Sequence, residues 1–264
     1  MERIFTDTHP WLVASTVAFA MVVGWLAGRR QGQRVRVRLK SRGQTPVSKF
    51  EDASLAVIGL LLAFTFSIAL GKHDQRRMLV VADSNAIGEF YTCAGLLKEP
   101  VRTKLRTVIH DYVALRVDLT QHRYDEATFE RALRQFQQMH NQMVELVSQA
   151  LENGTPMAVP LTNALNAVTS SHAARLAAIR DSLPASIVLL LLLSAVVSAM
   201  LVGRDQGATD QYDLAGTVSF VIVVSFAILV TVDLNQPDRG LITVSQEPIQ
   251  RLLSTMSQWA DHRS

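Results

Sequence analysis

Apolar residues in this 264-residue chain gather in four long stretches, separated by segments in which charged residues return. The stretches cover residues 11–27, 53–70, 185–202 and 215–232, and none contains Asp, Glu, Lys, Arg or His. A bilayer core about 30 Å thick needs roughly 20 apolar residues in a helix, with about 17 as the lower limit. Buried helices of soluble proteins seldom exclude every ionisable residue. The pattern therefore predicts four transmembrane helices.

The spacing of these stretches predicts an all-α membrane protein, in which two pairs of transmembrane helices flank a helical extramembrane domain. Positive charge follows the first stretch rather than preceding it, so we interpret that stretch as a retained anchor. The predicted parts are a first transmembrane helix at 1–28, a basic cytoplasmic loop at 29–52, a second helix at 53–70, the helical domain at 71–183, a third helix at 184–202, a short loop at 203–214, a fourth helix at 215–232, and a C-terminal tail at 233–264 with a short amphipathic helix.

A strongly basic segment follows the first stretch and sets the expected orientation. It holds eight Lys or Arg residues between positions 29 and 49, and no acidic residue before Glu51. Such segments stay on the cytoplasmic side, so we expect the domain at 71–183 on the outer face, periplasmic in a Gram-negative cell. The loop at 203–214 fits this less well, because three aspartates outnumber its one arginine. The basic segment sets topology in the simpler interpretation; in the other it also binds anionic lipid headgroups.

Between residues 71 and 183 the apolar residues recur at helical spacing, and acidic and basic residues nearly balance. One stripe begins after Pro100; a second starts at Asp125, a candidate N-cap, and stops at Asn153-Gly154. A third stripe, over 161–183, leads toward the third span. The segment 76–91 has no strong helix breaker, so the second span is expected to continue out of the bilayer as one helix. In the tail, 241–245 has strand periodicity and Pro248 opens the amphipathic helix.

Residues suited to catalysis or metal binding are few. His122 and Glu126 have the i, i+4 spacing that puts two ligands on one helix face, but a metal site needs three or four. Cys93 is the only cysteine, and no phosphate-binding loop, dinucleotide fingerprint or nucleophile elbow is present. Positive charge is concentrated in one segment rather than spread over a broad surface, which argues against nucleic-acid binding. We expect a non-enzyme with no catalytic residue, metal or cofactor.

The spans contain no ionisable residue, which argues against a proton relay but is compatible with a passive pore. The hydroxyls of Thr65 and Ser67 in the second span are candidate pore-lining groups. In the alternative interpretation, these hydroxyls bond back to their own helix. A pore predicts that both face a shared axis, whereas a simple anchor predicts that they face neighbouring helices. Gly24 and Gly28 form a G-x-x-x-G pair, which indicates either close helix contact or a chance spacing of two glycines.

Three stretches of the chain carry a resemblance to a known family. The first is 59–91, where the second span is followed by a polar segment. The second is the segment before the third span, with Arg175, Arg180 and Leu183-Pro184, and the third is 233–253. Together they resemble the bestrophin-like family of bacterial membrane proteins, which has no settled activity. The third span departs from the family pattern, since no aromatic residue follows soon after Pro184.

The resemblance has implications for both assembly and orientation. Bestrophins proper are pentameric anion channels, so the resemblance implies an oligomer that conducts an ion. They also keep the domain between the two membrane pairs in the cytoplasm, whereas the charges of this chain place it outside.

Two functional hypotheses follow. Asn85, Gly88 and Glu89 form a candidate functional motif where the second span emerges, facing an ion path or making a structural polar contact. The first hypothesis is an oligomeric bestrophin-like ion channel, a multi-pass protein of the bacterial inner membrane. Its expected partners are membrane lipids, further copies of the chain and a small ion, and no nucleic acid. The alternative is a membrane-anchored envelope protein whose helical domain binds a partner or senses a condition.

Overall fold

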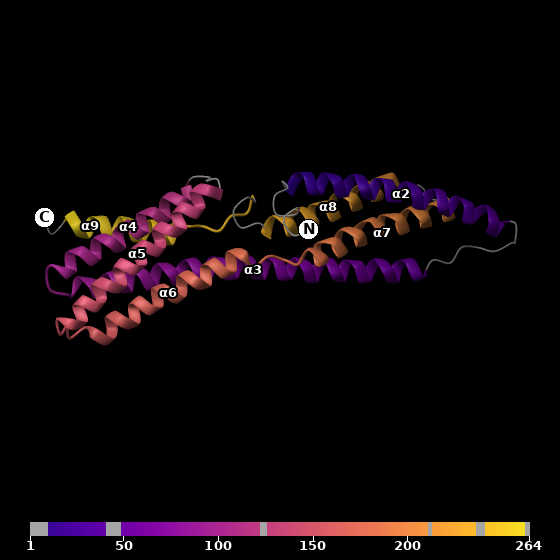
Figure 1. Cartoon of the computed structure of the whole chain (residues 1–264). Helices are drawn as coiled ribbons and strands as arrows, with labels where there is room; N and C mark the ends of the chain where they lie inside the picture. The colour runs from indigo at the N-terminus through magenta and orange to yellow at the C-terminus, as the bar shows by residue number, and fades with distance from the viewer. Residues whose placement is uncertain (1–9, 41–48, 122–125, 211–212, 236–240, 262–264) are drawn as a thin grey trace. The chain divides into compact units, whose positions relative to one another are not determined.

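The structure, a computed structural model, describes residues 10–40, 49–121, 126–210, 213–235 and 241–261. These residues form helices without any β-strand, which confirms the predicted all-α class (Figure 1). The helices are α2 (Pro10–Lys40), α3 (Lys49–Gly95), α4 (Val101–Gln121), α5 (Glu126–Glu152), α6 (Ala158–Arg180), α7 (Ala185–Thr209), α8 (Leu214–Leu234) and α9 (Glu247–Asp261).

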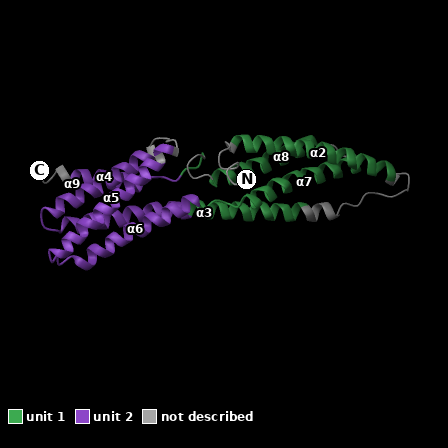
Figure 2. Cartoon of the chain, viewed as in Figure 1, with its two compact units in different colours: residues 1–74, 181–243 green, residues 75–180, 244–264 purple. Residues whose placement is uncertain are grey.

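The chain divides into two compact units (Figure 2). The first, here called the membrane unit, comprises residues 1–74 and 181–243, and the second, the helical unit, comprises residues 75–180 and 244–264. Four helical segments are long and apolar enough to cross a membrane, and each overlaps one of the four predicted stretches. Helix α3 contributes to both units, which confirms that the second span continues as one helix.

Two predicted loops of the membrane unit are shorter than the sequence indicated. Helix α2 continues through the basic residues to Lys40 and α3 already begins at Lys49, so much of 29–52 is helical rather than loop. Helix α7 likewise runs to Thr209 and α8 begins at Leu214, so residues 203–209 of the predicted loop at 203–214 are helical. The extensions are stable as helices because they pack on each other, and Arg36 forms an ion pair with Asp210. This pair also places Asp210 at the same end of the unit as the basic residues.

Helices α2 and α7 pack in parallel with their backbones in close contact. A Cβ atom at Gly28 would overlap the carbonyl oxygen of Met200, and one at Gly203 would overlap that of Trp25. The same holds for Gly32 and Gly207, while Gly24 lies against Val196. The contact suggested by Gly24 and Gly28 is thus confirmed, and it extends over five glycines. Small residues permit this approach, which increases the van der Waals contact between helices in a membrane.

The core of the membrane unit lies between α2, α7 and α8, where Met21, Leu191 and Ile228 are fully buried. Trp25 is also buried, and its indole Nε1 donates a hydrogen bond to Oε1 of Gln206 at 3.1 Å. Nε2 of Gln206 in turn donates to Thr217 Oγ1 at 2.9 Å, so one side chain connects all three helices. Trp25 therefore joins α2 to α7, and Gln206 extends the connection to α8.

The helical unit packs around large apolar side chains from its five helices. Its core includes Phe90, Ile109, Met143, Leu161 and Ile249. Helix α4 begins directly after Pro100, and α5 ends at Glu152 before Gly154, whose φ of 67° is readily adopted by glycine. Both boundaries were predicted, while Asp125 lies outside the described residues.

The C-terminal tail differs from the prediction in two ways. Helix α9, the predicted amphipathic helix, buries Ile249 and Met256 in the core of the helical unit, so 244–264 belongs to that unit rather than to a separate tail. The segment 241–245 is not a strand. Instead, the carboxylate of Asp233 accepts hydrogen bonds from the backbone N–H groups of Leu241 and Ile242, at 2.7 and 2.8 Å.

Candidate functional site

Helix α3 is the span that its own chain covers least. Only 11% of its most apolar 18-residue window is buried, against 39% in α8. One side of α3 exposes large apolar residues at helical spacing, with exposed fractions of 60% for Val57, 57% for Leu60 and 62% for Phe64. Ser67 and Ile68 follow on this side, and both are exposed. We call Val57, Leu60, Phe64, Ser67 and Ile68 the open face of α3.

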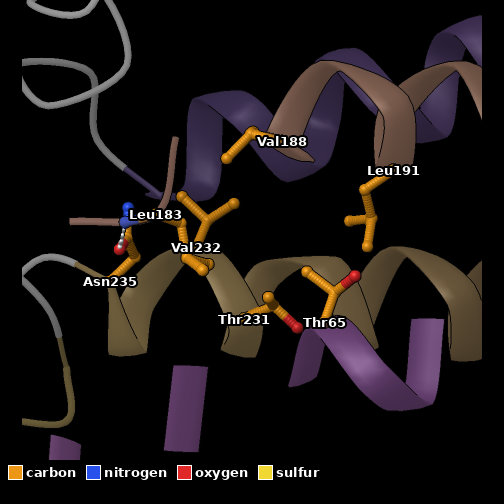
Figure 3. A pocket seen from close by; sticks show the side chains of 7 residues that line it. All are labelled: Thr65, Leu183, Val188, Leu191, Thr231, Val232 and Asn235. Carbon is orange, nitrogen blue, oxygen red and sulfur yellow. Dashed lines mark hydrogen bonds between the residues drawn. The ribbon is translucent and has the colours of Figure 1, made fainter. Parts of the chain in front are cut away.

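Thr65 lies on another side of α3. It is 3% exposed and lines a small pocket of the membrane unit together with residues of α7 and α8 (Figure 3). Its hydroxyl donates to the carbonyl oxygen of Leu61 at 2.8 Å, and Thr231 across the pocket bonds back to Ala227 at the same distance. The pocket is lined by Thr65, Leu183, Val188, Leu191, Thr231, Val232 and Asn235.

The two candidate pore-lining residues are therefore not equivalent. Positions two apart on a helix point about 200° away from each other, and Thr65 faces α7 and α8 while Ser67 belongs to the open face. Back-bonding to its own helix accounts for the Thr65 hydroxyl. Only Ser67 is accessible to a neighbouring molecule or an ion path.

The candidate motif in the helical unit also separates into two environments. Asn85 and Glu89 are exposed and lie one turn apart on the same side of α3. Gly88 is half-buried, and a Cβ atom there would lie 3.3 Å from the Leu252 side chain of α9. Beside it, the Ser84 hydroxyl donates to the carbonyl oxygen of Pro248 at 3.0 Å. Gly88 thus lies against α9, whereas the polar pair faces outward.

A buried polar cluster in the helical unit escaped the sequence reasoning. Asp83 of α3 is fully buried, and its carboxylate accepts hydrogen bonds from Arg116 of α4, from the Ser171 hydroxyl at 2.9 Å and from Arg175 Nη1 at 3.2 Å. Nη2 of Arg175 also donates to Oε1 of Gln246 at 2.6 Å. The cluster ties α3, α4 and α6 to the segment that precedes α9.

The cluster places two guanidinium groups around one carboxylate in an apolar setting. Arg116 is 5% exposed and lies over the rings of Tyr112 and Phe136, 4.9 and 5.7 Å from their centroids. Buried charges are tolerated only when they are paired and hydrogen-bonded, which Asp83 achieves with three donors. In the sequence, the position of Asp83 among apolar residues of one helix face was the feature that could have indicated a buried charge. The sequence alone does not show which charged residues a fold will bury.

His172 adjoins this cluster as a neutral side chain. Its Nδ1 lies within hydrogen-bond distance of Arg116 Nη2 and at 3.3 Å from the hydroxyl of Tyr112. Because Arg116 can only donate, Nδ1 must be the unprotonated nitrogen. Burial, followed by the charge of Arg116, lowers the pKa of His172 to about 4, and Arg175 and His140 act in the same direction. Burial also raises the pKa of Tyr112.

Metal ligands do not gather in the part of the chain that the structure describes, where no three His, Cys, Asp or Glu side chains come together. This finding does not apply to the candidate pair His122 and Glu126. His122 lies outside the described residues, and the side chain of Glu126 is likewise not described.

Comparison with known proteins adds the family. A family model for the Bestrophin-like domain matches residues 14–249. No curated protein sequence matches the chain at a significant level. The fold is shared with two mutant structures of a bacterial bestrophin homolog from Klebsiella pneumoniae: one is 11% identical with a TM-score of 0.65, and the other is 12% identical with a TM-score of 0.66.

These alignments cover nearly the whole of each protein. Each includes 92% of this chain, with 95% and 99% of the two Klebsiella chains, respectively. A structure described as a membrane protein is 13% identical with a TM-score of 0.62, over 92% of this chain and 99% of its own. With a family match over most of its length and four helices able to cross a membrane, this chain belongs to the Bestrophin-like family and is an integral membrane protein.

Proposed function

We propose that several copies of this chain assemble in the bacterial inner membrane around a common axis, with the open face of α3 toward that axis, and conduct a small ion. The observation that carries this proposal is the poor cover of α3 by its own chain. The large apolar residues exposed along one side of this span must be covered by lipid or by another copy. The family resemblance, which implies an oligomeric channel, favours another copy.

The composition of the open face supports conduction rather than simple anchoring. Phe64 and Leu60 would form a narrow apolar constriction in an oligomer, and the Ser67 hydroxyl would follow it directly. Apolar constrictions and hydroxyls are sufficient to line a passive ion path, without any charged residue in the membrane. In the helical unit, Asn85 and Glu89 are exposed one turn apart on α3, and polar side chains of this kind suit the ion path that the motif is expected to face.

The charges support an orientation with the basic end of α2 inside the cell. Asp210, one of the three aspartates that fit this orientation less well, is paired with Arg36 of the basic segment. The parallel packing of α2 and α7 agrees with a multi-pass protein in which the first and third spans run inward. The helical unit is then periplasmic, unlike the corresponding domain of bestrophins proper.

The test is ion flux through the purified full-length protein in liposomes, with oligomeric state measured by light scattering. Ser67→Trp enlarges a residue on the open face and should block flux. Val223→Trp is the matched control, because Val223 is 65% exposed on α8 within the same unit. Flux blocked by the first substitution and unchanged by the second supports the pore. No flux from a folded wild-type oligomer would leave a membrane-anchored binding or sensing protein as the better explanation.

A further inference from the structure

The helical extension of α2 carries arginines on the same side as an exposed apolar surface. Phe19, Val23 and Leu26 are 71%, 48% and 42% exposed, and they recur at three- and four-residue intervals. Continuing this spacing along the helix leads to Arg30 and Arg34, both exposed. One side of a single helix thus changes from apolar to cationic within one turn.

The opposite side of the extension is occupied. Gly28 and Gly32 lie against the backbone of α7, and Arg36 pairs with Asp210. Arg29 lies over the Trp25 ring, 5.7 Å from its centroid. The close backbone contact holds the extension in place, so the exposed arginines keep a defined position relative to the span.

The distances along the helix match the headgroup layer of a bilayer. This layer is about 5–7 Å thick on each side of the apolar core. With a rise of about 1.5 Å per residue from Ala27, the backbone of Arg30 lies about 4–5 Å and that of Arg34 about 10 Å beyond the core. The long arginine side chain reaches back over several ångströms. Arg38, about 16 Å beyond the core, lies farther out than a Debye length of about 8 Å.

We propose that Arg30 and Arg34 bind the phosphate groups of anionic phospholipids in the adjacent leaflet. The apolar surface of Phe19, Val23 and Leu26 would contact the acyl chains of the same lipids. Guanidinium groups suit this role because they bind phosphate oxygens in a bidentate manner. No acidic residue occurs within the segment 29–40 itself, and Asp210 beyond α7 pairs with Arg36. This binding does not depend on ion conduction.

The experiment titrates the purified full-length protein, in an uncharged detergent, with phosphatidylglycerol or phosphatidylcholine and measures bound lipid by native mass spectrometry. The wild type should prefer phosphatidylglycerol. Removing both charges in Arg30→Gln/Arg34→Gln should weaken its binding roughly thirtyfold, because each arginine near the surface contributes about 1 kcal/mol. Binding of phosphatidylcholine should not change.

Two further variants separate this role from general charge or folding. Arg131→Gln/Arg134→Gln removes the same charge from α5 of the helical unit and should alter phosphatidylglycerol affinity less than twofold. Arg30→Lys/Arg34→Lys keeps the charge and should retain the preference. Equal losses in the α5 variant, or unchanged affinity in Arg30→Gln/Arg34→Gln, would overturn the proposal.

Two conditions test the kind of ligand, and they use only the wild type. Raising the salt concentration should weaken phosphatidylglycerol binding, since the attraction is between charges near water. Salt-insensitive binding would overturn the proposal even if the glutamine variant fails to fold. Inorganic phosphate at the same concentration as the lipid should not displace it. Displacement would instead indicate a site for free anions.

Discussion

Replacing Asp83 by Asn tests whether the buried polar cluster holds the helical unit together. The substitution keeps the size of the side chain and removes its charge. Arg116 and Arg175 would then remain buried, 5% and 15% exposed in their side chains, with no carboxylate between them. The Ser171 hydroxyl would lose a charged acceptor, because the Asn side chain is a neutral amide with one oxygen in place of two.

Removing one member of a buried ion pair costs about 3–5 kcal/mol, because the remaining charge is left uncompensated. The total stability of a folded protein is about 5–15 kcal/mol, so Asp83→Asn should remove a large part of it. The expected fall in Tm is on the order of 10 °C, from a shift of about 2–4 °C per kcal/mol. Exposed surface substitutions usually stay within about 0.5 kcal/mol.

The assay is thermal unfolding of the full chain in detergent, followed by circular dichroism. Asp111→Asn is the matched control, because Asp111 lies on α4 of the same unit with 56% of its side chain exposed. It should leave Tm within about 2 °C of the wild type. Arg116→Met on the Asp83→Asn background should recover part of the loss, because it removes one of the unpaired charges. If Asp83→Asn and Asp111→Asn shift Tm equally, the cluster does not stabilise the fold and the reasoning is refuted.

Three further predictions concern pH, helix packing and ion preference. The pKa of His172 is lowered to about 4 from its ordinary value of 6.5, so the unfolded chain takes up the proton first as the pH falls. Stability that is present above pH 6.5 should therefore be lost as the pH falls toward 4. Between pH 7 and pH 5, Tm should fall less in His172→Gln than in the wild type, and parallel falls would contradict this. Gly28→Val should separate α2 from α7 and lower both Tm and yield, whereas Gly59→Val, with nothing within 4 Å of its added Cβ, should change neither. Exposed carboxylates repeated around an axis favour cations over anions. Glu89→Gln should therefore reduce the preference for cations, measured as the reversal potential across a salt gradient, while Glu145→Gln on α5 should not. An identical preference in the wild type and both variants would place Glu89 outside the ion path.

Sequence alone determined the number of spans, the helical class and the continuity of α3. These properties depend on short-range rules: a bilayer sets the length of an uncharged apolar stretch, and a helix continues until a breaker or a cap ends it. The start of α4 and the end of α5 could be predicted for the same reason, because Pro100 and Gly154 act on their immediate neighbours. The family resemblance rested on residues that are adjacent in the chain and could also be identified without coordinates.

Tertiary structure decided which side chains meet. Thr65 and Ser67 are equivalent as hydroxyls in one span, and only the packing of α7 and α8 shows that the first is enclosed and the second open. Asp83 and Arg175 are 92 positions apart, and their pairing depends on how α3 and α6 approach. The helical course of residues 29–40 was likewise decided by contact with α7, since a basic segment is equally compatible with a loop. The burial of a side chain depends on all the helices around it, so the residues that form a site can be identified only from the packed structure.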